Sequence, residues 1–255
     1  MTTPIDDFSG KRVLVTGGSG DIGRAICTAF AARGARVAFT FFSSHDGKRK
    51  TAEAIETAGG PEPLAIRCNL RDDDAPAQIA SPVIEAWGGV DIFVSNAASG
   101  VLRPTLELTK KHWDWTVNVN ARSLLLLANL LVPHMPTGGR IMALTSMGAV
   151  RAIEHYAAVG ASKAALESVI RHLAMDLGPR GITANAICPG VVDTQALQHF
   201  PNRQQLIDIA TMRTPNRRIV TPEDVANVAV LLASPLASMI QGQTIVVDGG
   251  YAILA

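Results

Sequence analysis

The stretch RVLVTGGSGDIG, residues 12–23, decides the fold of this chain. Its first five residues are a short run rich in β-branched side chains, as expected for a buried strand. A turn with four glycines follows directly, then helical spacing over residues 24–33 and a second strand over 36–42. Strand, glycine turn, helix and strand form a βαβ unit, which directs backbone N–H groups and a helix N-terminus at a diphosphate.

The same alternation continues to the end of the chain. Further strands are predicted at residues 64–68, 90–95, 140–146, 182–187 and 244–247. Further helices are predicted at residues 51–58, 75–87, 109–132, 155–177 and 222–233. We therefore predict an α/β protein with one Rossmann-type domain over residues 1–255, a doubly wound parallel sheet of about seven strands with helices on both faces. Residues 195–218 are predicted to form a helical excursion that covers the substrate.

Composition excludes several classes of function. The chain has 255 residues, 47% apolar residues and a formal net charge of +1, so no nucleic-acid partner is expected. Cys27, Cys68 and Cys188 are scattered without a CxxC motif, which predicts reduced core residues and no metal site. The N-terminus is polar and the longest apolar stretch, residues 124–132, is too short for a bilayer. We expect a cytoplasmic protein with no membrane partner.

An acid–base pair stands within LTSMGAVRAIEHYAAVGASK, residues 144–163. Tyr156 and Lys163 are seven residues apart, which puts them two turns apart on nearly the same face of a helix. Lys163 can lower the pKa of Tyr156 by proximity, and Tyr156 can donate a proton to a developing oxyanion. A helix with one exposed lysine and one half-buried tyrosine is the alternative interpretation.

The end of the second strand bears on the choice of cofactor. An NAD-binding fold places an acid there for the ribose 2′-hydroxyl, whereas this chain has Ser43 and Ser44, followed by the cations at residues 48–50. Hydroxyls and cations suit a 2′-phosphate, which favours NADPH without excluding NADH. The basic run is alternatively the solvated first turn of a helix, and Asp46 close by argues against a phosphate site.

Matching pieces along the chain resemble the short-chain dehydrogenase/reductase family over nearly its whole length. They are Thr16-Gly17 with Gly23, Asn96-Ala97-Ala98, Asn120, Ser146, Tyr156 with Lys163, and Pro189-Gly190 through Thr194. The resemblance implies a nicotinamide cofactor and commonly a homotetramer. It also implies that Lys163 holds the nicotinamide ribose, Asn120 supports a water relay and Thr194 lies near the carboxamide or diphosphate. The predicted cofactor-binding residues are Gly17, Ser19, Gly20, Asp21, Ile22, Ser43, Ser44, Asn69, Leu70, Asn96, Ala97, Lys163, Pro189, Gly190, Val192 and Thr194.

Two departures from the family pattern matter. Asp21 stands where the glycine turn normally has a glycine, so this carboxylate is expected to cap the helix or to point away from the diphosphate. The common Tyr-x3-Lys spacing would place the tyrosine at Val159, but the tyrosine is Tyr156. Tyr-x6-Lys resembles the enoyl-acyl-carrier-protein reductases, as do HFPNR at residues 199–203 and MIQGQT at 239–244, which resemble the NADPH-using enoyl reductase III group.

The wider spacing has a physical interpretation. In enoyl-thioester reduction the hydride goes to the β-carbon and charge develops on the thioester oxygen, so the proton donor stands farther along the substrate. Three residues of helix shift its origin by roughly 4.5 Å. We therefore predict hydride transfer from NADPH to a trans-2-enoyl thioester on acyl carrier protein, with Tyr156 stabilising and protonating the enolate.

Other residues complete this hypothesis. Ser146 is expected to line the site or assist the oxyanion, with capping of backbone at the strand end as the alternative. For Asn120 the alternative is a helix-kink residue that bonds backbone of the adjacent strand, and both roles are compatible. The predicted substrate contacts are Ser99, Leu102, Tyr156, Leu197 and Phe200. Trp113 and Trp115 are expected to pack in the core or an interface. The alternatives are a 3-oxoacyl or other carbonyl reductase, a tailoring reductase for a ring or conjugated acid in secondary metabolism, and a non-catalytic dinucleotide-binding protein.

Overall fold

A computed structural model describes residues 7–195, 197–199 and 203–254 of the chain. Within them, seven strands form one parallel sheet in the order β3-β2-β1-β4-β5-β6-β7. The strands are β1 Arg12–Val15, β2 Arg36–Phe41, β3 Leu64–Arg67, β4 Ile92–Ser95, β5 Arg140–Leu144, β6 Thr183–Pro189 and β7 Thr244–Val247. The predicted Rossmann-type doubly wound fold is confirmed.

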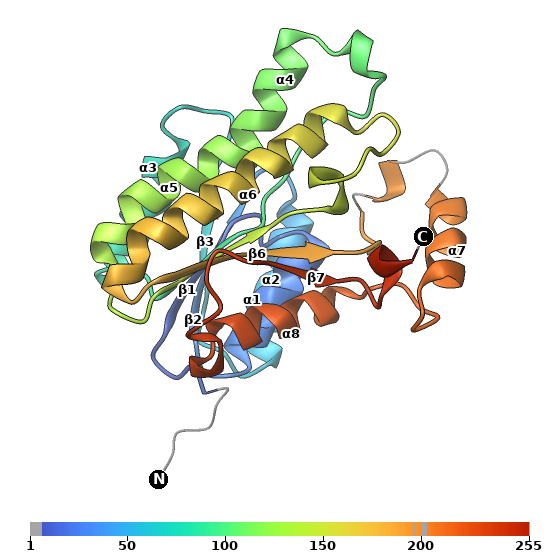
Figure 1. The fold of residues 1–255 in the computed structure, drawn as a ribbon. Coiled ribbons are helices and arrows are strands. Elements are labelled where there is room, and N and C mark those ends of the chain that lie inside the picture. Colours follow the sequence, from blue (N-terminus) through green and yellow to red (C-terminus); the bar gives the residue numbers. More distant parts are fainter. Residues whose placement is uncertain (1–6, 196, 200–202, 255) are drawn as a thin grey trace.

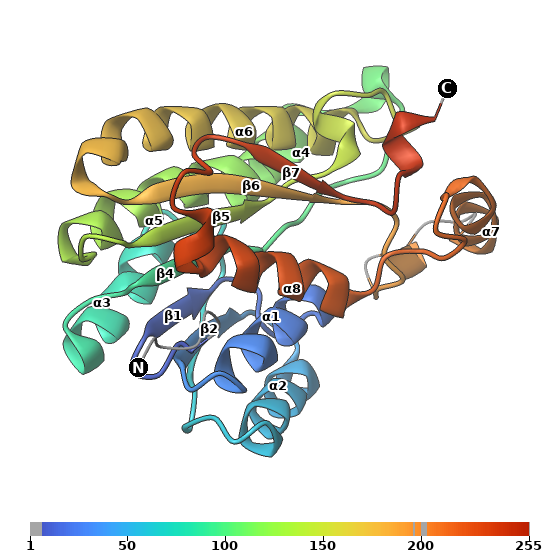
Figure 2. The same ribbon diagram turned by 60° about the horizontal axis from the view of Figure 1, so that its bottom comes forward.

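Helices cover both faces of this sheet (Figures 1 and 2). They are α1 Asp21–Ala31, α2 His45–Thr57, α3 Ala75–Trp87, α4 Lys110–Val117, α5 Ser123–Leu131, α6 Ala157–Leu177, α7 Arg203–Arg213 and α8 Pro222–Ala233. One core joins α3, α5 and α6 to the sheet and contains Phe93 and Leu124. The other joins α1, α2 and α8 to the opposite face and contains Phe30 and Phe39. The strands are apolar on both sides because both faces are covered.

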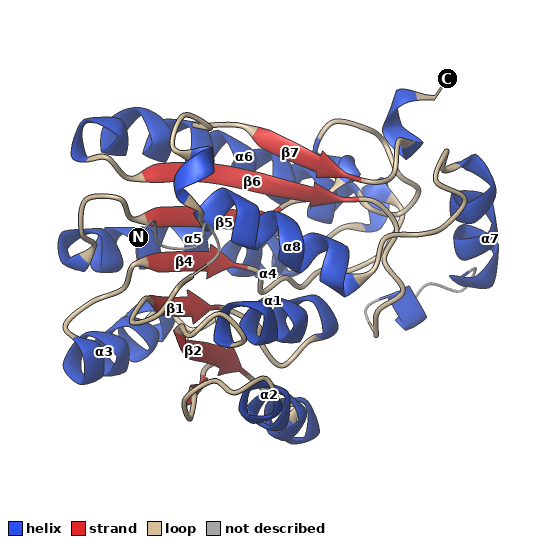
Figure 3. Ribbon diagram, turned by 90° about the horizontal axis from the view of Figure 1, so that it is seen from below, coloured by secondary structure: helices blue, strands red, loops and turns tan. Residues whose placement is uncertain are grey.

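The order of the strands reverses between β1 and β4, which are neighbours in the sheet. Figure 3 shows that the strands point the same way, so their carboxyl ends share one edge, and α7 stands beyond that edge. A crevice outside the carboxyl ends at such a switch point is where open α/β sheets bind ligands. The topology therefore places the glycine turn after β1 and the ends of β4, β5 and β6 at one site.

Three helical segments differ from the sequence-based expectation. Helix α2 begins at His45 rather than residue 51, because the Ser44 hydroxyl accepts a 3.0 Å hydrogen bond from the Gly47 N–H and caps it. The helix expected over 109–132 is interrupted by a π-helical turn, Asn118–Arg122. The excursion consists of a 3₁₀ turn, Leu197–His199, and α7.

The helical run Lys110–His134 is long and apolar enough to cross a membrane by length and composition. Half of its most apolar window is nevertheless buried inside the fold. Within the run α4 packs on α6 and α5 packs on α3, and Leu124, Leu127 and Leu131 are buried in the core on this face of the sheet.

Candidate active site

Two glycines of the turn after β1, Gly17 and Gly23, lie too close to their neighbours to carry a side chain. Gly17 has a φ of +67°, and a Cβ on it would lie 2.8 Å from the Ala97 Cα. A Cβ on Gly23 would lie 2.3 Å from the Gly17 carbonyl oxygen. The Asn96 amide donates to the carbonyls of Thr16 and Gly17 at 3.0 and 3.1 Å, which fixes the turn against the end of β4.

A cavity of about 450 Å³ runs along the carboxyl ends of the strands, over this turn and the first turn of α1. The first backbone N–H groups of a helix have no partner within the helix and attract anions, so the site suits a dinucleotide's diphosphate. Eleven predicted residues line the cavity: Gly17, Ser19, Gly20, Asp21, Ile22, Asn69, Leu70, Asn96, Ala97, Ser99 and Thr194. Ser43, Ser44, Pro189, Gly190 and Val192, predicted for the cofactor, lie outside its lining.

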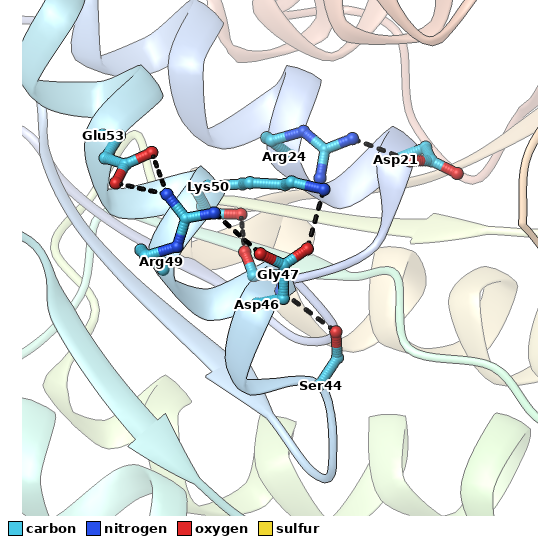
Figure 4. Close-up of polar contacts among 9 residues, drawn as sticks. Asp21, Arg24, Ser44, Asp46, Gly47, Arg49, Lys50 and Glu53 are labelled. Atoms are coloured by element: carbon cyan, nitrogen blue, oxygen red, sulfur yellow. Dashed lines mark hydrogen bonds and ion pairs between the residues drawn. The ribbon is translucent and has the colours of Figure 1, made fainter.

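Most of the basic run after β2 is engaged within α2 (Figure 4). Arg49 bonds both Asp46 and Glu53, and Lys50 pairs with Asp46 at 2.7 Å. Hydrogen bonds from Lys50 and Arg49 lower the pKa of the Asp46 carboxyl. These two cations thus behave as the solvated first turn of a helix. Lys48 differs, because its ammonium lies 5.6 Å from the centroid of the Phe41 ring at the end of β2.

Asp21 is the first residue of α1 and not its cap; the cap is Gly20, which lacks a capping side chain. One Asp21 carboxylate oxygen accepts a hydrogen bond from Arg24 at 2.7 Å, and the other accepts the Gln195 N–H at 2.8 Å (Figure 4 shows the Arg24 contact). The neighbouring Arg24 offsets its charge. Asp21 therefore connects the cofactor-binding turn to the loop that leads to the excursion.

The Tyr156 hydroxyl donates to the Ser146 hydroxyl at 3.4 Å. Ser146 stands at the N-cap position of a 3₁₀ turn, but its side chain makes no capping hydrogen bond, so its hydroxyl is available to Tyr156. Burial raises the pKa of Tyr156, while the Ser146 hydrogen bond opposes the rise. Tyr156 thus reaches the strand-end serine, despite standing three residues before Val159.

Lys163 is buried, and its ammonium donates to the Leu144 carbonyl at 2.7 Å. Burial lowers the pKa of Lys163 to about 8. The expectation that Lys163 lowers the pKa of Tyr156 is wrong for this structure, because the ammonium is turned to the Leu144 backbone and burial dominates the phenol. Tyr156 is the N-cap residue of α6 and Lys163 lies within that helix, so the phenol and the buried cation come from one segment of the chain.

Asn120 is fully buried in the π-helical turn. Its amide accepts from the Ser99 N–H at 2.8 Å and donates to the Ser99 carbonyl and the Ser162 hydroxyl at 2.9 and 2.8 Å. The side chain is therefore a structural tie between α4–α5, α6 and the loop after β4, as the helix-kink alternative expected.

Of the predicted substrate contacts, Ser99 and Leu102 are half-buried on the loop after β4, and Leu197 is half-buried in the 3₁₀ turn. Phe200 lies outside the described residues. Sequence reasoning missed Trp115, which lines the cavity with its ring 5.2 Å from the Arg71 guanidinium. Its spacing of four residues from Val119, which also lines the cavity, was the available signal. In the described part of the chain, no group of three or more His, Cys, Asp or Glu side chains is placed to hold a metal ion.

Comparison with known proteins agrees with this geometry. A family model described as "Enoyl-(Acyl carrier protein) reductase" matches residues 18–252. A structure titled as a short-chain dehydrogenase from Burkholderia cenocepacia J2315 in complex with NADP is 35% identical, with a TM-score of 0.87, and covers 96% of this chain and 98% of that one. This chain belongs to the short-chain dehydrogenase/reductase family.

Relatives within this family carry different activities. The 1-cyclohexenylcarbonyl-CoA reductase of Streptomyces collinus is 36% identical over 248 residues, which is 95% of this chain and 87% of that protein. The 7alpha-hydroxysteroid dehydrogenase of Escherichia coli K12 is 33% identical over 247 residues, 95% of this chain and 94% of that protein. These comparisons support the family and an NADP-type nicotinamide cofactor, but they do not support a particular closeness to enoyl reductase III.

Proposed function

We propose that the protein is an NADPH-dependent tailoring reductase for a ring-bearing conjugated thioester. The observation that carries the proposal is the contact between the hydroxyls of Tyr156, the N-cap residue of α6, and Ser146, just after the end of β5. Two hydroxyl groups in contact suit an oxygen on which negative charge develops.

The cofactor part rests on the cavity. Its lining at the end of β2 is Thr40 and Phe42, without an acid to accept a ribose 2′-hydroxyl. The NADP-bound relative supports the same choice. Bound NADPH would supply the hydride.

The chain's own residues then handle the oxygen. Tyr156 and Ser146 hold the thioester carbonyl by hydrogen bonds that strengthen as the enolate forms. Tyr156 donates the proton, because its raised pKa keeps it protonated at neutral pH. Lys163 would hold the nicotinamide ribose, as the family resemblance implies, and its buried ammonium adds positive charge to this end of the sheet.

A ring substrate is preferred to a straight-chain enoyl group on acyl carrier protein. Two relatives, a cyclohexenylcarbonyl-CoA reductase and a hydroxysteroid dehydrogenase, are named for ring-bearing substrates, and the first is named for a conjugated thioester. Direct reduction of a ketone is the second candidate. It is supported by the contact of Tyr156 with Ser146, since the two hydroxyls can bind a ketone oxygen together although Val159 occupies the common tyrosine position.

The test is oxidation of NADPH, followed by absorbance, with thioesters of 1-cyclohexenylcarbonyl, crotonyl and acetoacetyl groups and with a cyclic ketone. Highest turnover of the cyclohexenyl thioester is expected. Preference for crotonyl would restore a fatty-acid enoyl reductase, and preference for acetoacetyl or the ketone would favour the second candidate. Binding of NADPH without any turnover would contradict both. The homotetramer remains a prediction that light scattering can test, and the cytoplasmic location remains a prediction that cell fractionation can test.

A further inference from the structure

His155, directly before Tyr156, has a left-handed backbone with a φ of +59°. In the described part of the chain only Arg217 shares this feature among non-glycine residues. Such a conformation is uncommon outside glycine; asparagine, aspartate and histidine adopt it several-fold more often than other residues, and a β-branched residue rarely does. Backbone strain of this kind gathers at functional sites.

The left-handed residue shapes a tight turn at the start of α6. The Tyr156 N–H donates to the Ile153 carbonyl at 3.2 Å, which makes His155 the third residue of a four-residue turn. A positive φ at that position is typical of a type II turn. The His155 carbonyl accepts the Arg103 N–H at 3.0 Å, so the turn is held against the loop after β4.

Gly148 lies under the tyrosine ring. A Cβ on Gly148 would lie 2.6 Å from both Cδ1 and Cε1 of Tyr156 and 3.4 Å from the Ser146 hydroxyl oxygen. The Gly148 backbone is itself held close, because a Cβ on Gly160 of α6 would lie 2.6 Å from its carbonyl oxygen. The position of the Tyr156 ring therefore requires a residue without a side chain at position 148.

Val159, at the position where the family commonly has its tyrosine, packs in the interior of the fold. Val159 is buried, and a Cβ on Gly100 would lie 2.4 Å from its Cγ2. A donor must then reach Ser146 from elsewhere on the chain. The turn at His155 and the space above Gly148 provide that route.

We propose that His155 and Gly148 are positioning residues, which bring the Tyr156 hydroxyl to Ser146 from three residues before the common position. His155 acts through its backbone and Gly148 through its lack of a side chain. This inference rests on the proposed role of Tyr156 as proton donor.

The test uses four variants of the full chain. Gly148→Ala pushes the ring by the shortest possible side chain, and Gly178→Ala is its matched control, because a Cβ there meets only the Gln241 side-chain nitrogen, at 3.7 Å. His155→Val disfavours the left-handed backbone, whereas His155→Asn tolerates it. The conservative variant separates the backbone from the imidazole and from general loss of folding.

Two readouts are combined. The chain has two tyrosines, Tyr156 and Tyr251, so 3-fluorotyrosine labelling gives two ¹⁹F resonances, assigned with Tyr251→Phe. We expect Gly148→Ala and His155→Val to move the Tyr156 resonance alone and to lower kcat on the order of 10-fold or more. In these two variants the KM for NADPH should stay within about twofold of the wild-type value. In Gly178→Ala and His155→Asn both kcat and the KM for NADPH should stay within about twofold.

An unmoved resonance with unchanged kcat in Gly148→Ala would overturn the inference, as would equal losses in the valine and asparagine variants. A moved resonance with unchanged turnover would show that the ring placement is right and that Tyr156 is not the donor. That outcome contradicts the proposed function separately. Retention of wild-type kcat in His155→Asn supports the backbone role.

Discussion

Tyr156 is the residue on which the chemistry depends, because its hydroxyl meets Ser146 at 3.4 Å. Tyr156→Phe removes that hydroxyl and keeps the ring on Gly148. We expect kcat to fall on the order of 10²–10⁴-fold, as for loss of a general acid. NADPH affinity, measured by fluorescence titration, should be unchanged, because the ring does not line the dinucleotide cavity. Reduction at the wild-type rate would remove Tyr156 from the mechanism.

Lys163 sets the expected pH dependence. Its pKa is lowered to about 8 by burial, so the ammonium form is present below pH 8 and is lost as the pH rises. If the site needs this cation, kcat/KM for NADPH should be level below pH 8 and fall above it. Tyr156 adds no limit there, because its pKa is raised above its ordinary value. A profile that stays level to about pH 10 would contradict the role of Lys163.

At the scale of elements, the π-helical turn Asn118–Arg122 is held by Asn120. Asn120→Ala leaves the Ser99 N–H without its side-chain acceptor and Ser162 without its donor inside the fold. We expect a loss of unfolding free energy on the order of 3 kcal/mol, measured by urea denaturation. Asn118→Ala, in the same turn, is the matched control. Equal stability of the two variants would show that the ties to Ser99 and Ser162 contribute little.

A second element-scale contact joins α1 to the excursion. Asp21 accepts the Gln195 N–H, and the Asp193 carboxylate accepts three hydrogen bonds from Arg203 at the start of α7. Asp21→Ala should raise the KM for the thioester about 10-fold or more, because a hydrogen bond to a charged group contributes about 1.5–3 kcal/mol. Asp114→Ala, which removes an exposed carboxylate on α4, is expected to leave this KM unchanged. An unaltered KM in Asp21→Ala would separate the excursion from substrate binding.

The elements that the sequence predicted well carry local signals. Helix α8 matches residues 222–233 because Thr221 and Asp224 form a capping box around Pro222, and β7 matches residues 244–247. A kink at Asn120 was one of the sequence-based alternatives, but its π-helical form was not predicted, because the bonds of Asn120 to Ser99 and Ser162 join distant segments. The early start of α2 was missed because Ser44 was interpreted as a phosphate ligand and not as a cap.

Over the whole molecule, the order of strands placed most of the dinucleotide site, because βαβ units bring their carboxyl ends to one edge. The order of strands does not determine which way individual side chains point. Trp115, predicted to pack in the core or an interface, packs against the core and also lines the cavity. Of the two interpretations of the basic run, the pairing of Arg49 and Lys50 with Asp46 favours the solvated helix turn over the phosphate site. Such choices depend on contacts between elements, which spacing alone does not give.

Binding of the cofactor should stabilise the molecule as a unit, because the cavity joins the ends of β1 to β4. NADPH at 100 times its Kd should add about 2.7 kcal/mol to the free energy of unfolding, measured as a rise in Tm, and NADH at equal concentration should add less. Phe42→Asp places an acid at the end of β2, where it repels a 2′-phosphate and accepts a 2′-hydroxyl. The order of the two Tm shifts should then reverse, whereas Phe42→Ala should keep it. Equal shifts with both cofactors in the wild type would show that the missing acid at β2 does not select NADPH.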